Sequence, residues 1–198
     1  MIDASLPLPS ATASLVYLYV GWGVILASLT GTFARKKMFI PAVLLWVGLP
    51  LAFSTPEYSP AYWLGLAFQA PSLVSVGLCA GLVAPQRFAP RRPLTFAALA
   101  SGLGWILVLD SFAVLPLEFY ALGFQAGIAG GVMVLLLLIS FEPITLIAAS
   151  ALVVYVTLRL PTGNVWDATL DPLLWLWSQW YIVKTAVKRI QYARLAIK

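Results

Sequence analysis

The sequence predicts an all-α, polytopic membrane protein of about seven transmembrane helices, and three observations lead to this fold class. The 198 residues are 62% hydrophobic and only 10% charged, whereas a soluble domain carries about 25% charged residues. The apolar residues form continuous runs, such as LVYLYVGWGVILASL, rather than the short alternating segments of an outer-membrane barrel. The Lys and Arg residues also collect on one side of a simple threading of the chain through a bilayer.

Seven apolar segments are candidates for membrane spans, each of which needs about 20 apolar residues. We expect them at approximately 13–34, 38–54, 61–84, 94–110, 117–140, 143–160 and 172–190. The second and fourth are short, so they would stand nearly upright or thin the bilayer locally. The preceding stretch MIDASLPLPSATA has no basic region, so we expect the first span to be retained rather than cleaved as a signal peptide. Residues 1–198 would then form a single integral membrane domain.

The distribution of charge predicts an outside N-terminus and a cytoplasmic C-terminus. Eleven of the 12 Lys and Arg residues fall on the cytoplasmic side of this threading, and Arg159 is the exception. Six of the seven Asp and Glu residues fall on the outer side, and Glu142 is the exception. Short cytoplasmic loops are enriched in Lys and Arg, so the net charge of +5 indicates orientation rather than nucleic-acid binding. An Ala-, Pro- and Arg-rich composition suggests a bacterial inner membrane.

Two stretches of the chain resemble each other at a distance of 56 residues. PAYWLGLAFQA begins at Pro60 and PLEFYALGFQA begins at Pro116, and a third, weaker copy begins at Pro172. The offset predicts tandem helical hairpins at 35–84, 91–140 and 142–190, although an apolar composition also matches itself by chance. True hairpin copies would share one orientation, with a symmetry axis along the membrane normal.

Glutamines inside the predicted spans are the candidates for a binding site. An amide that faces hydrocarbon is costly, so we expect Gln69 and Gln125 to point inward, either to make interhelical hydrogen bonds or to bind a substrate. Gln179 lies near the matching place in the third copy. Pro71 would open its helix and free backbone carbonyls beside Gln69. Residues 69–71 are therefore the most promising part of the sequence for a polar site.

Charged residues near the outer surface form a second candidate group. Arg159 departs from the charge pattern, and we expect it to pair with Glu118, Asp167 or Asp171, or with a lipid phosphate. Such pairing would lower the cost of a cation close to the apolar layer.

The basic C-terminal tail is the third candidate group. Residues 185–198 read as an amphipathic helix that leaves the membrane along the cytoplasmic headgroups. Lys184, Lys188, Arg189 and Arg194 would contact those headgroups. The alternative is that this helix docks onto a partner protein.

The inventory of reactive side chains favours a function without catalysis. The chain has no His and a single cysteine, Cys79, so the commonest metal ligand and general base are missing. We expect no metal, no cofactor and no nucleic acid, and we expect membrane lipids and other integral membrane proteins as partners. The first hypothesis is a non-catalytic subunit or scaffold in a larger inner-membrane complex. The alternatives are a small-solute transporter or channel component that uses the intramembrane glutamines, and a lipid-acting membrane enzyme.

Overall fold

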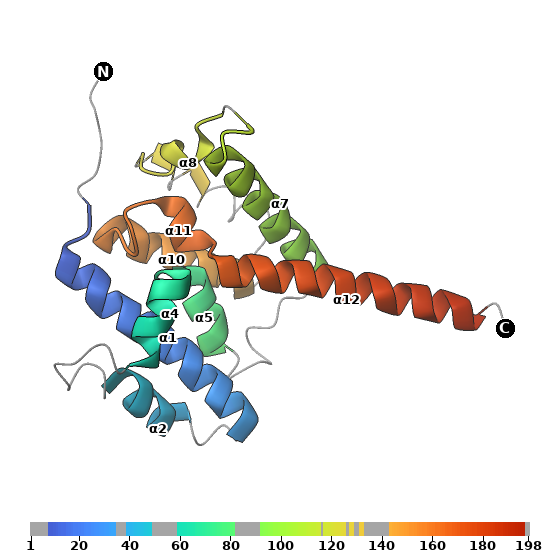
Figure 1. The fold of residues 1–198 in the computed structure, drawn as a ribbon, viewed down its shortest axis with the longest axis horizontal. Coiled ribbons are helices and arrows are strands. Elements are labelled where there is room, and N and C mark those ends of the chain that lie inside the picture. The colour runs from blue at the N-terminus through green and yellow to red at the C-terminus, as the bar shows by residue number, and fades with distance from the viewer. Residues whose placement is uncertain are drawn as a thin grey trace.

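The computed structural model of the chain describes residues 8–34, 39–48, 59–81, 92–115, 117–125, 127–128, 131–132 and 143–196. Within these ranges the regular structure is helical and contains no β-strand (Figure 1). The predicted all-α class is therefore confirmed.

The described helices follow one another along the whole chain. They are α1 (Ala11–Ala34), α2 (Phe39–Val43), the π-helical turn η2 (Leu44–Gly48), α4 (Pro60–Phe68), α5 (Leu73–Gly81), α7 (Pro93–Ser111), α8 (Phe119–Leu122), α10 (Pro143–Leu158), α11 (Val165–Thr169) and α12 (Pro172–Ala196).

Proline and short polar side chains mark where these helices begin. Helices α4, α7, α10 and α12 each start with a proline, which fits the first helical position because the missing N–H has no intrahelical partner there. Ser59 caps α4 by accepting from the Ala61 amide, and Asn164 caps α11 in the same way. Asp171 accepts a 2.7 Å hydrogen bond from the Leu174 amide and so caps α12. Local sequence signals therefore fix most of the helix starts.

Two described helices are long and apolar enough to cross a membrane. They are the Ala11–Thr30 stretch of α1 and the whole of α7, while the apolar part of α10, Thr145–Leu158, is shorter. The predicted spans 13–34, 94–110, 143–160 and 172–190 correspond to α1, α7, α10 and α12. Seven spans go beyond what these helices establish.

Two of the predicted elements differ from the structure, and a third is described only in part. The segment 61–84 is two helices, α4 and α5, separated at residues 69–72, because Pro71 has no N–H and disfavours a helical residue before it. In the segment 117–140, the described residues 117–125 hold only the four-residue helix α8 and a turn, and most of the rest lies outside the described ranges. The segment 38–54 is described only to residue 48, as α2 and η2.

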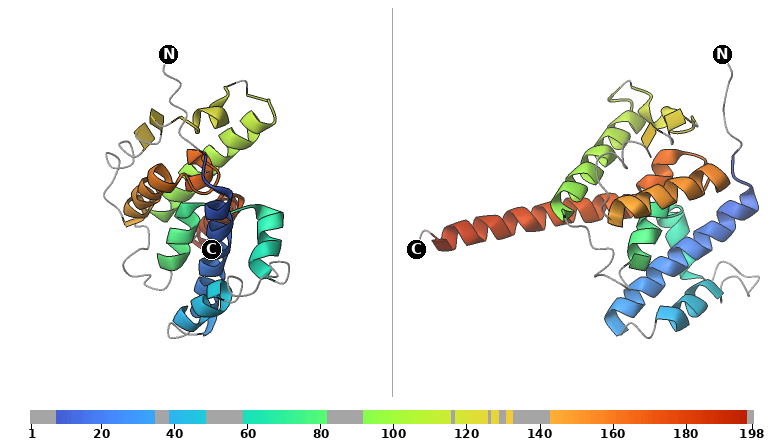
Figure 2. Two further views of the ribbon diagram at one scale, coloured as in Figure 1. Left: turned by 90° about the vertical axis from the view of Figure 1, so that its left-hand side faces the viewer. Right: turned by 180° about the vertical axis from the view of Figure 1, so that it is seen from behind.

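The described part of the predicted tail, residues 185–196, is not a separate element. Helix α12 runs unbroken from Pro172 to Ala196, so the tail continues the helix that packs against the body. Figures 1 and 2 show α12 extending well beyond the other described helices.

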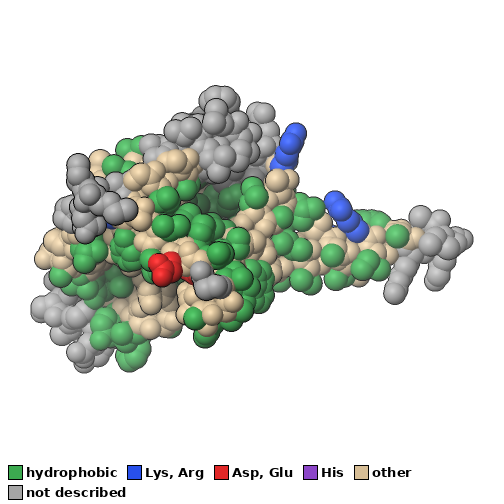
Figure 3. Space-filling view, turned by 90° about the horizontal axis from the view of Figure 1, so that it is seen from above, with side chains coloured by type: hydrophobic (Ala, Val, Ile, Leu, Met, Phe, Trp, Pro, Cys, Tyr) green, Lys and Arg blue, Asp and Glu red, His purple; other side chains and the backbone are tan. Residues whose placement is uncertain are grey.

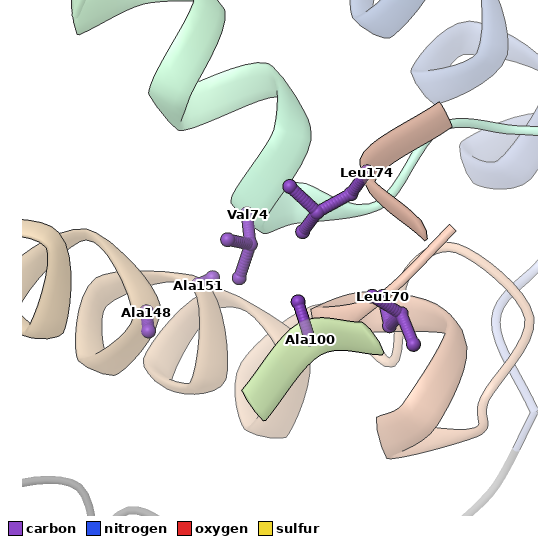
Figure 4. Packing of buried hydrophobic residues seen from close by; sticks show 6 residues of the cluster. All are labelled: Val74, Ala100, Ala148, Ala151, Leu170 and Leu174. Atoms are coloured by element: carbon purple, nitrogen blue, oxygen red, sulfur yellow. The ribbon is translucent and has the colours of Figure 1, made fainter. Parts of the chain in front are cut away.

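Helices from both halves of the chain meet in one hydrophobic core (Figure 4). It contains Val74 of α5, Ala100 of α7, two alanines of α10, Leu170 and Leu174. The small alanine side chains let the helix backbones approach closely. A second cluster joins α10 to α11 through Leu152, Tyr155 and Trp166, and a third joins α1 to α4.

The contact between α7 and α12 depends on one glycine. A Cβ atom added to Gly104 would lie 2.1 Å from Cδ1 of Trp175, so only glycine allows the indole to lie against α7. Gln179 donates a 2.7 Å hydrogen bond to the Ser101 hydroxyl one turn away. The base of α12 is thereby fixed to the body.

Candidate functional site

The break between α4 and α5 contains a residue with an unusual backbone conformation. Gln69 ends α4 with φ 63° and ψ −162°, a region that is essentially restricted to glycine. Its amide donates to the Gly65 carbonyl at 2.9 Å. A residue held in such a conformation is strained by about 1–3 kcal/mol, and surrounding contacts must hold it in place.

Helix α1 supplies the donors for the carbonyls that this break releases. The Trp22 indole Nε1 donates to the Gln69 carbonyl at 2.9 Å, and the Tyr17 hydroxyl donates to the Pro71 carbonyl at 2.8 Å. Both donors belong to α1, which packs against α4 and α5. Two of the carbonyls at this break, those of Gln69 and Pro71, are therefore satisfied within the chain.

Asp171 connects this break to the start of α12. One carboxylate oxygen accepts from the Ser72 amide and the other from the Leu174 amide, each at 2.7 Å. The side chain is only 7% exposed and lies at the N-termini of α5 and α12 together, where two helix dipoles favour a negative charge. The Ser72 hydroxyl completes the cap of α5 by accepting from the Ser75 amide at 3.0 Å. We call Gln69–Ser72, Tyr17, Trp22 and Asp171 the helix-break cluster.

Arg159 organises a second polar group at the end of α10. It follows the helix with φ 59° and is 5% exposed. One terminal nitrogen donates to the Gly163 carbonyl at 2.7 Å and the Phe124 carbonyl at 3.3 Å, and the other donates to the Tyr155 hydroxyl. The guanidinium carbon lies 4.5 Å from the centre of the Tyr155 ring, a distance typical of a cation–π contact.

The structure does not bring Arg159 into an ion pair with the three carboxylates suggested by the sequence. Asp171 belongs to the helix-break cluster, and Glu118 is exposed with a left-handed backbone. Asp167 accepts from the Tyr120 hydroxyl at 2.8 Å and the Thr162 hydroxyl at 2.5 Å. Arg159 instead joins two loops by binding their carbonyls, and its Nε has no hydrogen-bond partner among the described residues.

Helix α11 and the turn before it make contacts that the sequence does not predict. Asn164 caps α11 and also donates to the Tyr120 carbonyl at 2.9 Å. The Trp166 ring stacks on Phe119 at 4.6 Å between ring centres. Asn before a short apolar helix is a recognisable capping signal, but its second bond is not.

The three glutamines lie in different surroundings. The Gln69 and Gln125 side chains are exposed on the outside of the described chain, and Gln179 is half-buried against Ser101. The inward orientation predicted for Gln69 and Gln125 is therefore not seen within a single chain. Two exposed amides on an apolar exterior require either water or another protein as their hydrogen-bond partner.

The basic residues of the tail are carried by α12. Lys184, Lys188 and Arg189 are exposed, and the Lys184 ammonium lies 4.3 Å from the centre of the Trp180 ring. The side chain of Arg194 lies outside the described part of the structure.

The described residues contain no group of three His, Cys, Asp or Glu side chains that could hold a metal ion. Comparison of the chain with protein-family models, curated proteins and solved structures gives no match. The function therefore has to be inferred from the residues themselves.

Proposed function

We propose that this chain is a non-catalytic integral membrane subunit that packs with partner proteins in a larger inner-membrane complex. Helix α7 is the observation that supports a membrane location best. It is apolar over 19 residues, and only 17% of its apolar stretch is buried inside the molecule. The central helix of a soluble protein would be mostly buried, whereas an exposed apolar helix of this length suits lipid or another apolar protein surface.

The rest of the exterior agrees with this proposal. Val153 and Leu158 of α10 and Leu99 and Trp105 of α7 are exposed. Hydrophobic side chains are also spread over the visible face of the body and of the projecting helix (Figure 3). We propose seven spans with the N-terminus outside and the C-terminus in the cytoplasm, because that topology places eleven of the 12 Lys and Arg residues inside.

The hydrogen bonds already made within the helix-break cluster favour a subunit over a transporter. Its released carbonyls bind Trp22 and Tyr17, and the Asp171 carboxylate binds two amides. These four hydrogen bonds are made within the chain, and they hold the break in place without a solute. The exposed amides of Gln69 and Gln125 suit polar contacts to a neighbouring helix, which are a common means of association in membranes.

A small-solute transporter is the second candidate, and the backbone at Gln69 is the observation that favours it. Interrupted helices form the substrate sites of many transporters, and a residue in a glycine-only conformation is a frequent sign of function. Partner binding and transport predict different results for the same variants.

The experiment that tests the proposal uses the full chain, expressed in a bacterial inner membrane and purified in a mild detergent. A subunit should bring a stoichiometric membrane protein with it, and Gln69→Leu and Gln125→Leu should reduce that recovery. A transporter should move solutes in liposomes when pure and alone, and the same variants should abolish the flux. Transport by the isolated chain at a useful rate, without any partner, would overturn the subunit proposal.

The topology has its own test. With Cys79 replaced by alanine, single cysteines at Arg92 and Thr162 would be treated with a membrane-impermeant maleimide on intact spheroplasts. We expect labelling at position 162 and none at position 92 until the membrane is opened. The opposite result would exclude the proposed orientation.

A further inference from the structure

Helix α12 presents a surface that the body of the molecule does not use. Its 25 residues extend about 37 Å at 1.5 Å per residue. Near its start, Trp175 and Gln179 hold it against α7. Its second half projects away from the other described helices in Figure 1 and in the right-hand view of Figure 2.

A regular apolar stripe runs along the exposed side of this helix. It consists of Leu176, Trp180, Val183, Val187 and Ile190, all of which are exposed. Their spacing of four, three, four and three residues places them on one face of the helix. This spacing is the pattern with which one helix packs lengthwise against another. We call these five residues the α12 stripe.

Cationic side chains border the α12 stripe on one side. Lys184 and Lys188 follow the stripe positions Val183 and Val187 by one residue and are exposed. The Lys184 ammonium lies over the Trp180 ring, which holds the charge at the edge of the stripe. A partner that covers the stripe would therefore meet positive charge along one flank.

The unbroken course of α12 argues against a stripe that rests flat on lipid headgroups. Such a helix lies in the plane of the interface, whereas the stripe begins at Leu176, in the half of α12 that packs against α7. No bend separates that half from Val187 and Ile190. The stripe therefore follows one straight line from the body to the basic end.

We propose that the α12 stripe docks a single helix of a different membrane polypeptide, with an apolar contact face and carboxylates opposite Lys184 and Lys188. A second copy of this chain fits less well, because residues 172–198 contain no Asp or Glu that could lie opposite these cations. The inference rests on the proposed subunit function and assigns its partner surface.

Two synthetic helical peptides of 25 residues test this assignment directly. Both carry the same Leu and Ile face, but one has Glu and the other has Lys at the flanking positions. Each peptide carries an acceptor fluorophore, and the full chain carries a donor at its C-terminus in phosphatidylcholine nanodiscs. We expect energy transfer to report at least tenfold tighter binding of the Glu peptide, and the Lys184→Glu, Lys188→Glu double variant to reverse this preference.

Two further variants separate the stripe from the rest of the helix. Val187→Asn should weaken binding of the Glu peptide about tenfold, because it places an amide in the apolar contact. Tyr192→Asn is the matched control, since Tyr192 is also large and exposed on α12 but lies outside the stripe. It should bind like the original chain.

Three results would overturn the inference. Equal binding of the two peptides would exclude a partner helix with carboxylates opposite Lys184 and Lys188. Disulfide formation between two chains that carry Val187→Cys, without peptide binding, would assign the stripe to a second copy. If neither peptide binding nor the disulfide is observed, the α12 stripe faces lipid. If the Val187→Asn variant still recovers the native partner, the proposed function survives and only the assignment of the stripe fails. If the original chain recovers no partner at all, the proposed function itself is refuted.

Discussion

Replacement of Asp171 by alanine should destabilise the fold more than any other single carboxylate substitution among the described residues. Asp171 caps α12 through the Leu174 amide, and loss of a helix cap costs about 1 kcal/mol. Its other oxygen binds the buried Ser72 amide at 2.7 Å, and a buried donor left without an acceptor costs about 1–3 kcal/mol. The two effects predict a loss of about 2–4 kcal/mol in the free energy of unfolding.

The assay is equilibrium unfolding of the full chain in mild-detergent micelles titrated with dodecyl sulfate, followed by far-UV circular dichroism. Asp171→Asn keeps one acceptor oxygen but turns an NH₂ group toward the second amide, so we expect about half of the loss. Glu118→Ala is the matched control, because Glu118 is exposed and makes no capping hydrogen bond, and it should change stability by less than about 0.5 kcal/mol.

An Asp171→Ala variant that unfolds within about 0.5 kcal/mol of the original chain would refute this reasoning. It would mean that water or another group satisfies the Ser72 amide, and that the carboxylate does not join α5 to α12. Equal losses for Asp171→Ala and Glu118→Ala would lead to the same conclusion.

The other predictions concern four more positions and use the same unfolding titration. Gly104→Ala should destabilise the chain by about 1–3 kcal/mol, because the added methyl group overpacks against Trp175. Gly102→Ala in the same helix, where a Cβ meets no atom within 4 Å, should stabilise the chain by about 0.5–1 kcal/mol. Similar effects at both positions would contradict the close α7–α12 contact. Gln69→Gly should stabilise the chain by about 1 kcal/mol, because the backbone strain that it relieves costs more free energy than the ordering of the more flexible glycine. An equal gain from Gln69→Ala would argue against that strain. Arg159→Met should lose about 2 kcal/mol, since it removes hydrogen bonds from a charged donor to two loop carbonyls, and unchanged stability would show that those loops hold together without it.

The helical class and much of the helix layout could be read from the sequence because their causes are local. Apolar runs and a low charge content predict helices without strands. Pro60, Pro93, Pro143 and Pro172 stand at helix starts, where a fixed φ and a missing N–H cost nothing. Pro71 likewise indicates a break, although the apolar run around it favours a single span over 61–84.

The partners of the polar groups could not be read in the same way. Tyr17 reaches the Pro71 carbonyl from 54 positions away, and Asp171 reaches the Ser72 amide from 99 positions away. Arg159 has three nearby carboxylates in the sequence's outer loops, yet it binds loop carbonyls. Which acceptor lies within 3 Å depends on how α1, α10 and α12 pack, and charge alone carries no such information.

The sequence by itself determined that this chain is helical, how its charges are distributed, and where its helices begin, since each of these depends on residues within a turn or two of one another. Only the tertiary structure decided that the released carbonyls are capped by α1, that Gln69 and Gln125 are exposed, and that α12 continues unbroken to its basic end. Hydrogen bonds form over about 3 Å, so contacts between distant segments exist only once the packing of whole helices has placed those atoms together.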